Sequence, residues 1–309
     1  MYDLIIIGGG PAGITAATMA INQRLETLII AEQWGGQTTY AMQLEEMEGR
    51  EILAGETLLE AFRRQLDYLD FVRRFETVTK IMPGERCPEP RTPSEERGFA
   101  VCTARGNCFE GRTLIIATGA KPQRLDVPGE VRLAGHGLSY SAATHAGLFL
   151  GKEVAVVGHE RRAQCATADL ARKAHRVYLL APKPLSDTPL ARILRQTPNV
   201  EVAEGVTVKD VRGKYFVESI AVAMTDGKER EIPIKGVFVK LPRTPNSGLV
   251  HEWVDCDRAG HIIVDVNCAT SWPGVFAAGD VTHVSEQALV HIGEGAKAAI
   301  SAYHHLLMC

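Results

Sequence analysis

The alternation of apolar and polar positions at the start of the chain indicates a strand, a turn, a helix and a second strand. Residues 2–7, YDLIII, form a short β-branched apolar run that ends in the glycine turn GGGPAG. The segment ITAATMAI that follows has helical composition, and a second apolar run, TLIIAE, ends at Glu32. This order predicts a βαβ unit of the kind that binds nucleotides.

A second pattern of the same kind begins 150 residues later. Residues 152–158, KEVAVVG, read as a strand and a turn, residues 161–173 as a helix, and RVYLLA as the next strand. The repeat predicts two related nucleotide-binding domains. The first domain is expected at 1–118 plus 247–309, interrupted by the second at 119–246.

The remaining segments continue the mixture of strands and helices. Residues 55–75 carry apolar residues at helical spacing, which predicts an amphipathic helix, and LPRTPNSG at 241–248 has the composition of a linker. Strands are expected at 77–82, 98–104 and 108–117, within 206–241, in GHIIVDV at 260–266 and in PGVFAAGD at 273–280, with a last helix at 284–307. The pattern predicts an α/β fold with two Rossmann-like, three-layer ββα domains.

Composition and charge narrow the function classes. The chain has 309 residues, 45% hydrophobic and 23% charged, which suits two domains of ordinary size. A formal charge of −3 argues against a nucleic-acid partner.

No apolar run approaches the roughly 18 residues of a membrane span, and LIII is too short for a signal-peptide core, so we expect a cytoplasmic protein without a transmembrane segment. Seven cysteines without a CxxC pair oppose a disulfide scaffold and a zinc ribbon, and no metal site is expected.

The first glycine turn has the spacing of a dinucleotide-binding motif. Gly8 permits the tight turn, Gly10 lets the backbone approach a pyrophosphate, and Gly13 lets the helix pack on the strand. The N-terminus of the helix offers free N–H groups to phosphates. Glu32 follows Gly13 by 19 residues, where a carboxylate accepts hydrogen bonds from ribose hydroxyls.

Three further stretches extend this site. IIATG at 115–119, GVFAAGDV at 274–281 and GGQ at 35–37, together with the glycine turn, resemble the FAD-binding domain of the flavoprotein disulfide reductases, and within them the low-molecular-weight thioredoxin reductases. The resemblance covers nearly the whole chain and implies an FAD-binding first domain and an NADPH-like second domain. It implies that FAD contacts Gly8, Gly10, Pro11, Ala12, Gly13, Glu32, Gln33, Gly36, Gln37, Thr38, Val78, Ala117, Thr118, Gly119, Gly279, Asp280, Gln287 and Ala288.

The second glycine turn departs from the pattern of these relatives. VVGHERRAQ keeps Gly158 and has Ala163 at the packing position, but Glu160 replaces the glycine that approaches the pyrophosphate. A bulky, negatively charged side chain there opposes phosphate binding. The next strand is followed by APKP around Lys183 instead of an arginine-rich run. The sequence therefore predicts that NADPH does not bind, although Lys183 with Arg161 and Arg162 offers an alternative way to hold a phosphate.

The segment SYSAATHAG at 139–147 aligns with the redox-active segment of thioredoxin reductases but lacks its two cysteines. Ser141 and Thr144 occupy those positions, and hydroxyls cannot store two electrons as a disulfide. His145 stands near the acidic proton donor of the relatives, and Tyr140 or Trp34 could stack on a flavin.

No catalytic residue is assigned from the sequence. The candidates are His145, Tyr140 and Cys165, a cysteine near the start of the second-domain helix at 161–173, where a thiolate is favoured. Each cysteine is interpreted as an inert thiol, and no pair is chosen, although Cys102 and Cys108 flank a tight turn.

The leading functional hypothesis is an FAD oxidoreductase that does not use NADPH. It would exchange electrons with a redox partner protein or a small thiol/disulfide couple. The resemblance extends to the diflavin-linked disulfide oxidoreductases, which implies a second FAD per chain. A ferredoxin–NADP reductase-like flavoenzyme and a catalytically silent flavin-binding redox sensor or scaffold are the alternatives. By resemblance alone, the protein is expected to be a homodimer.

Overall fold

The computed structural model describes residues 1–36, 42, 64, 73–84, 98–283 and 287–308. The chain forms two compact units, which exchange at Lys121/Pro122 and at Arg243/Thr244. The second unit also contains Met42, whose Sδ accepts a hydrogen bond from the Gly137 N–H at 3.4 Å. Sequence analysis places Met42 in the first domain. The predicted domain limits, 1–118 plus 247–309 for the FAD-binding domain and 119–246 for the NADPH-like domain, remain a prediction.

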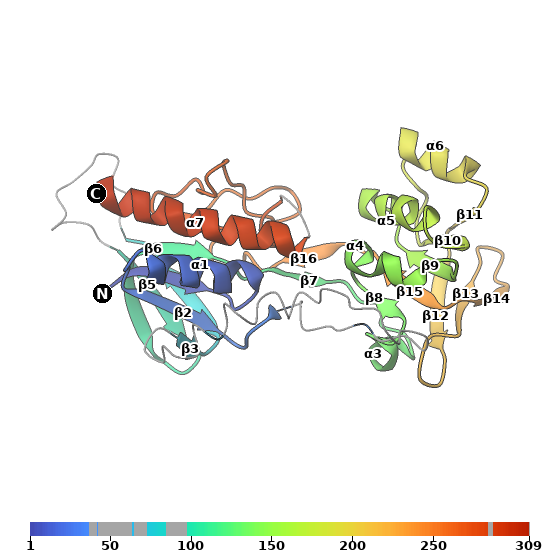
Figure 1. Cartoon of the computed structure of the whole chain (residues 1–309), viewed down its shortest axis with the longest axis horizontal. Helices are drawn as coiled ribbons and strands as arrows, with labels where there is room; N and C mark the ends of the chain where they lie inside the picture. The colour runs from blue at the N-terminus through green and yellow to red at the C-terminus, as the bar shows by residue number, and fades with distance from the viewer. Residues whose placement is uncertain (37–41, 43–63, 65–72, 85–97, 284–286, 309) are drawn as a thin grey trace. The chain divides into compact units, whose positions relative to one another are not determined.

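The first unit is built on one seven-stranded sheet (Figure 1). The strand order is β3-β2-β1-β6-β5-β4, and β17 also pairs with β6. Strands β3, β2, β1, β6 and β17 run parallel, whereas β5 pairs antiparallel with β6 and β4 pairs antiparallel with β5. The elements are β1 (Tyr2–Ile7), α1 (Pro11–Asn22), β2 (Thr27–Ala31), β3 (Arg73–Phe75), β4 (Val78–Met82), β5 (Phe99–Thr103), β6 (Cys108–Ile116), β17 (Val275–Ala277) and α7 (Ala288–Met308).

The alternation in β1 explains the three layers of this unit. Leu4 and Ile6 pack against α1 and α7, which lie side by side over one face of the parallel strands. Ile5 and Ile7 point to the opposite face and pack with residues of β4 and β5, among them Val101. Burial on both faces is typical of a parallel sheet covered on each side, and it explains why the strand is a continuous apolar run.

The second unit repeats this design. Its parallel sheet has the order β11-β10-β9-β15-β8, and a separate antiparallel sheet has the order β12-β13-β14. Val154 and Val156 of β9 face the helices, whereas Ala155 and Val157 face the antiparallel sheet. The elements are α3 (Glu130–Leu133), β8 (Leu138–Ser139), α4 (Ala142–His145), a 3-10 helix (Ala146–Phe149), β9 (Glu153–Val157), α5 (Arg161–Ala171), β10 (Arg176–Ala181), α6 (Pro189–Gln196), β11 (Val200–Glu204), β12 (Thr207–Arg212), β13 (Ser219–Ala223), β14 (Glu229–Pro233) and β15 (Gly236–Val239). The predicted α/β class with two three-layer Rossmann-like domains is confirmed.

The two crossings of the chain between the units are paired. β7 (Ala120–Pro122) and β16 (Arg243–Pro245) form a two-stranded sheet. The segment 241–248, predicted to be a linker, contains β16. No helix within the described residues is long and apolar enough to cross a membrane.

Two sequence predictions about elements are wrong. GHIIVDV at 260–266 is not a strand, because Ile262 takes part only in isolated bridges and Val266 is 80% exposed. The predicted helix at 55–75 is wrong at its C-terminal end, because Arg73–Phe75 is strand β3. Most of the rest of the predicted helix lies outside the described residues.

The interpretation of every cysteine as an inert thiol is also wrong. Cys102 and Cys108 form a disulfide between β5 and β6. The sequence shows that the two flank a turn, but only the register of the two strands places them opposite each other. Among the described cysteines, Cys165, Cys256 and Cys268 are free.

Candidate functional site

The turn between β1 and α1 contains two glycines that are required for different reasons. Gly8 has φ +119°, and a Cβ placed on it would lie 2.1 Å from the Ala117 carbonyl oxygen. Gly13 is equally constrained, because a Cβ there would lie 1.9 Å from the Gly8 carbonyl oxygen. Gly10, by contrast, has an ordinary φ of −79°, and a Cβ on it would meet nothing within 4 Å. The space in front of Gly10 is therefore open.

This open space faces the N-terminus of α1. Gly10 is the N-cap residue, Pro11 is the first helical residue, and no side chain caps the helix. Pro11 and Ala12 are buried. The uncapped N–H groups and the positive end of the helix dipole are suited to a phosphate.

The carboxyl ends of β2 and β3 supply the next groups. Glu32 directly follows β2, is exposed, and its Oε1 accepts a hydrogen bond of 3.1 Å from the Thr77 hydroxyl. Gln33 is exposed beside it, and Val78 begins β4 right after Thr77. Thr77 was not singled out by sequence analysis, because its role depends on the pairing of β2 with β3.

The segment after Glu32 turns back over the glycine turn. Gly36 has φ +54°, and a Cβ on it would lie 3.2 Å from the Gly10 Cα. Trp34 lies beside Gly9 and packs edge-on against Phe75, with ring centroids 5.3 Å apart. The Trp34 indole N–H is buried and has no hydrogen-bond partner within the described residues. The predicted contacts Gln37 and Thr38 lie outside the described residues.

The turn after β6 lies at the same edge of the sheet. Ala117 is buried, and its N–H donates to the Ile7 carbonyl oxygen at 2.8 Å. Thr118 and Asn246 are paired twice, because the Thr118 hydroxyl donates to the Asn246 carbonyl and the Asn246 amide donates to the Thr118 carbonyl, both at 2.8 Å. The Asn246 N–H also donates to the Gly119 carbonyl oxygen at 2.9 Å. Asn246 therefore fixes this turn, although sequence analysis placed it only in a linker.

The turn after β17 is held by the last helix. The Gly279 N–H donates to Glu294 Oε2 at 2.8 Å, and His291 Nε2 lies 3.4 Å from Asp280 Oδ1. Burial raises the pKa of Glu294, and the nearby Asp280 carboxylate adds to this effect. His291 and Glu294 were missed by sequence analysis, because only the packing of α7 against the sheet brings them to this turn.

The start of α7 completes the edge. Gln287 is exposed and its carbonyl oxygen accepts from the His291 N–H at 3.0 Å, while Ala288 is the first residue of the helix. α7 packs against α1 so tightly that a Cβ on Gly295 would lie 2.1 Å from the Ala12 carbonyl oxygen.

The structure thus brings most of the predicted contacts to one edge of one sheet. We call this edge, made by the turns at Gly8–Gly13, Glu32–Gly36, Ala117–Gly119 and Gly279–Asp280, the first dinucleotide site. It has an open cradle at Gly10, an uncapped helix N-terminus, a carboxylate and a buried indole N–H without a partner among the described residues. These features fit a dinucleotide with two phosphates and a ribose.

The corresponding turn of the second unit has nearly the same backbone angles at the residue that caps its helix. Gly158 has φ +152°, and a Cβ on it would lie 2.4 Å from the Lys240 carbonyl oxygen and 2.9 Å from the Ala163 Cβ. Glu160 is the N-cap residue of α5 with φ −79° and ψ 174°, compared with φ −79° and ψ −176° at Gly10. The exposed Glu160 side chain therefore starts where the first unit has open space.

The basic residues near this turn, Arg161, Arg162 and Lys183, differ in how far they are buried. Arg161 and Lys183 are exposed, whereas Arg162 is half-buried and donates from Nη1 to the Leu241 carbonyl oxygen at 3.2 Å. Cys165, a candidate for redox chemistry, lies on the exposed side of α5, one turn into the helix.

Ser141 and Thr144, which align with the two cysteines of thioredoxin reductases, are hydrogen-bonded to each other. The Ser141 hydroxyl donates to the Thr144 hydroxyl oxygen at 3.0 Å, with Ser141 at the N-cap of α4. His145 ends this helix, and its Nδ1 lies 2.8 Å from the Ser139 hydroxyl oxygen. Burial lowers the pKa of His145, and the charge of Lys240 lowers it further. Both effects favour the neutral form of this hydrogen-bonded imidazole.

Tyr140 takes part in a network of buried polar groups. Its hydroxyl donates to Glu130 Oε1 at 2.8 Å, and its carbonyl oxygen accepts from Lys240 Nζ at 2.9 Å. Glu130 is 1% exposed and also accepts from the N–H groups of Leu125 and Asp126. The ring packs at the edge of the core formed with the antiparallel sheet. These contacts account for Tyr140 as a structural residue of the second unit.

The fold and site together define a class of protein with two dinucleotide-binding folds, in which the second interrupts the first and the first has an open cradle. The chain belongs to the pyridine nucleotide-disulphide oxidoreductase family, whose pattern matches residues 2–299.

Known proteins similar to the chain are redox enzymes. It is 33% identical over 312 residues to an alkyl hydroperoxide reductase protein of Pseudomonas aeruginosa and 31% identical over 310 residues to an NADH dehydrogenase of Bacillus subtilis. Both alignments cover 99% of this chain but only 58% and 59% of those relatives.

Solved structures show the same fold over the whole chain. The thioredoxin reductase of Giardia duodenalis superposes with a TM-score of 0.87 at 27% identity and is covered to 99%, as is this chain. The thioredoxin reductase of Streptococcus pyogenes gives a TM-score of 0.85 at 28% identity, covering 99% of this chain and 98% of that one. The predicted resemblance to thioredoxin reductase-like flavoproteins is confirmed.

Proposed function

We propose that the protein is an FAD-dependent oxidoreductase in which NADPH is not the electron donor. FAD is assigned to the first dinucleotide site. A redox partner protein or a small thiol/disulfide couple exchanges electrons with it. The single observation that carries the proposal is the comparison of Gly10 with Glu160, because nearly identical backbone angles at the helix N-cap leave open space in one unit and carry a carboxylate in the other.

The residues of the first site have separable roles toward FAD. The N-terminus of α1 stabilises the pyrophosphate, and Gly10 leaves room for it. Glu32 accepts hydrogen bonds from the adenosine ribose, while Asp280, held beside His291 and Gly279, contacts the ribityl side. The N-terminus of α7 favours negative charge near the flavin ring. When bound, FAD supplies a two-electron redox centre.

The second unit supports a donor other than NADPH. A carboxylate about 4 Å from a phosphate costs roughly 1 to 4 kcal/mol, depending on how much water remains between them. The hydroxyl pair of Ser141 and Thr144 cannot cycle between thiol and disulfide, so this segment does not carry electrons from flavin to a disulfide partner in the way that a cysteine pair would. Relatives named thioredoxin reductase and alkyl hydroperoxide reductase support a thiol or disulfide partner. A second FAD per chain remains part of the proposal.

The test is anaerobic reduction of the purified protein. FAD is counted per chain, and bleaching of the flavin is followed with NADPH, NADH, a dithiol and reduced ferredoxin. We expect bleaching by the dithiol or ferredoxin and none by the nicotinamides, with NADH included because one relative is named NADH dehydrogenase. Rapid bleaching by NADPH would overturn the proposal and favour the ferredoxin–NADP reductase-like alternative. No bleaching by any donor would favour the silent sensor or scaffold, and one FAD per chain would exclude the diflavin assignment.

Variants at residue 160 test the cause directly. Glu160→Gly is expected to raise the affinity for NADPH by about tenfold or more, because it removes both the bulk and the charge. Glu160→Gln removes the charge alone and should give part of the gain. Unchanged, undetectable NADPH binding in both variants would show that Glu160 is not the obstacle.

A further inference from the structure

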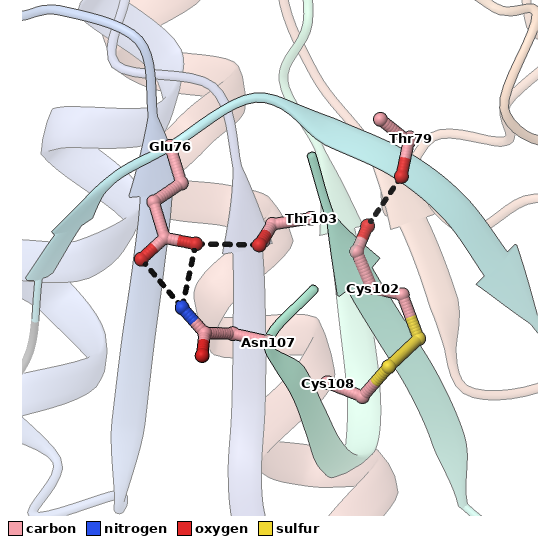
Figure 2. Close-up of a disulfide and its surroundings, with 6 residues drawn as sticks. All are labelled: Glu76, Thr79, Cys102, Thr103, Asn107 and Cys108. Carbon is pink, nitrogen blue, oxygen red and sulfur yellow. Dashed lines mark hydrogen bonds between the residues drawn. A yellow bond between two sulfur atoms is a disulfide. The ribbon is translucent and has the colours of Figure 1, made fainter. Parts of the chain in front are cut away.

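The Cys102–Cys108 disulfide closes the turn between β5 and β6 (Figure 2). The two cysteines lie directly opposite each other in the antiparallel ladder, with Cα atoms 4.1 Å apart. Cys108 is exposed and Cys102 is half-buried, so Cys108 is the cysteine of the pair that an external thiolate would approach. The Thr79 hydroxyl of the adjacent strand donates to the Cys102 carbonyl oxygen at 3.3 Å.

The closed turn supplies the hydrogen-bond donors for a buried carboxylate, Glu76. The Thr103 hydroxyl donates to Glu76 Oε2, and the Asn107 amide nitrogen lies 3.0 Å from Oε1 and 3.1 Å from Oε2. Glu76 is 8% exposed. The hydrogen bond from Thr103, and then that from Asn107, hold the pKa of Glu76 below its usual value. The three residues form what we call the Glu76 cluster, and Figure 2 shows them beside the disulfide.

The Glu76 cluster is connected to the adenosine end of the first dinucleotide site. The Glu76 N–H donates to the Ala31 carbonyl oxygen at 3.0 Å, immediately before Glu32. Thr77 accepts from the Ala104 N–H at 2.8 Å and donates from its hydroxyl to Glu32 Oε1 at 3.1 Å. The turn closed by the disulfide is therefore joined by successive hydrogen bonds to the carboxylate assigned to the ribose.

We propose that the Cys102–Cys108 pair is a thiol–disulfide exchange site whose redox state sets the affinity of the first dinucleotide site for FAD. The inference rests on the proposed function, since it assumes FAD at that site. The oxidised pair holds Thr103 and Asn107 against Glu76 and keeps Glu32 in position. The reduced pair lets the turn move, and the adenosine end binds FAD more weakly.

The exchange needs a dithiol as the co-reactant. Its thiolate attacks the Sγ of Cys108, which forms a mixed disulfide and releases Cys102 as a thiolate that takes up a proton. The second thiol of the dithiol then displaces Cys108, which is protonated in turn. The protein disulfide gains two electrons and two protons, and the dithiol becomes a disulfide.

The disulfide lies far from the Ala117–Gly119 turn of the first dinucleotide site. Cys108 begins β6, and the turn at Ala117–Gly119 follows its last residue, Ile116. A strand of this length spans about 26 Å at roughly 3.3 Å per residue. The disulfide is thus too far along the strand to exchange electrons directly at that turn, and its effect is on binding.

The test compares FAD affinity in the two redox states of the full chain. Apo protein is titrated with FAD by flavin fluorescence, as prepared and after reduction with a water-soluble phosphine, and thiols are counted in both samples after denaturation. We expect two additional thiols on reduction and an FAD dissociation constant higher by about fivefold or more. Equal dissociation constants in the two states would overturn the inference, as would the absence of two additional thiols.

Variants separate the linkage from general damage. The double variant Cys102→Ser/Cys108→Ser should bind FAD as weakly as the reduced protein and should not respond to the phosphine. Cys165→Ser, a matched control at an exposed free thiol, should keep the full response.

If the double variant does not fold, Thr77→Val serves instead. It keeps the disulfide but removes the hydrogen bond to Glu32, and it should reduce the response to the phosphine. A Thr77→Val response equal to that of the unmodified protein would contradict the linkage. Failure of FAD to bind in any state would refute the proposed function instead, with the thiol count unaffected.

Discussion

At the scale of single residues, the first glycine turn separates what the fold needs from what a ligand needs. Gly8 has no alternative, because its φ is +119° and a Cβ would overlap the Ala117 carbonyl. Gly10 meets no such limit, since its φ is −79° and its surroundings are open. Since the fold does not require a glycine at position 10, we attribute this glycine to the room that a pyrophosphate needs next to the backbone.

Gly10→Ala is therefore expected to weaken FAD binding without damaging the fold. A methyl group at this position occupies the path of the pyrophosphate, and we expect the FAD dissociation constant to rise by about tenfold or more. The stability of the apoprotein should change by less than about 1 kcal/mol. Thermal unfolding of the apoprotein and an FAD titration measure the two effects.

The matched control is Gly8→Ala. This variant should lose more than about 2 kcal/mol of apoprotein stability, because the left-handed backbone and the contact with Ala117 both oppose a side chain. If Gly10→Ala destabilised the apoprotein as much as Gly8→Ala, the space in front of Gly10 would not be a ligand cradle.

At the scale of elements, the position of α1 depends on its contact with α7. A Cβ on Gly295 would lie 2.1 Å from the Ala12 carbonyl oxygen, so the two helices touch through main chain. Ala12 lies in the first turn of α1, next to the cradle. The close packing of the two helices therefore fixes the N-terminus that faces the phosphates.

Gly295→Ala should push the helices apart and weaken both stability and FAD binding. We expect a loss of about 1 to 3 kcal/mol in the free energy of unfolding, as for other overpacked contacts. Gly293→Ala is the control on the same helix, because Gly293 is exposed and a Cβ there meets nothing within 4 Å. That control should be neutral or stabilise by up to about 1 kcal/mol, since alanine favours helix. Denaturant unfolding of both apoproteins provides the measurement, and similar losses in the two variants would argue against the helix contact.

The elements that could be predicted from the sequence are those whose pattern is local. The strand 2–7 and the helix after it follow from an apolar run, a glycine turn and a helical segment, and the copy at 152–158 follows in the same way. GHIIVDV has the letters of a strand, but Asp265 Oδ1 accepts from the N–H groups of Asn267 and Ala269 and turns the chain. A side chain that bonds its own backbone thus prevented the strand pairing.

The candidate site was only partly predictable, for a similar reason. Its glycines and Glu32 are marked by spacing along the chain. His291, Glu294, Thr77 and Asn246 reach the site only because distant segments pack together, and nothing in their local sequence marks them. The Cys102–Cys108 pair likewise depends on the register of β5 with β6.

At the scale of the whole molecule, two units of the same architecture differ at the helix N-terminus where a dinucleotide phosphate would bind, which is open at Gly10 in the first unit and carries Glu160 in the second. Each has a parallel sheet between helices and an antiparallel layer. A ligand that binds only one unit stabilises only that unit, by RT ln(1 + [L]/Kd).

Hydrogen exchange measured by mass spectrometry should therefore show where FAD binds. At FAD near 100 times its Kd, amides of β1, α1 and the start of α7 should exchange up to about 100-fold more slowly than in the apoprotein. Amides of β9 and the start of α5 should be unchanged if one FAD binds per chain. Protection at α5 as well would indicate a second FAD on the second unit, and protection at α5 alone would contradict the assignment of FAD to the first.

The near-identity of the main chain at Gly10 and Glu160 has a practical consequence for protein engineering. At the residue that caps the helix, the second unit already has the backbone angles of the first unit's cradle, and it differs there in carrying a side chain. A search for nicotinamide-dependent variants would begin with saturation of codon 160 and a few basic neighbours, without redesigning a backbone.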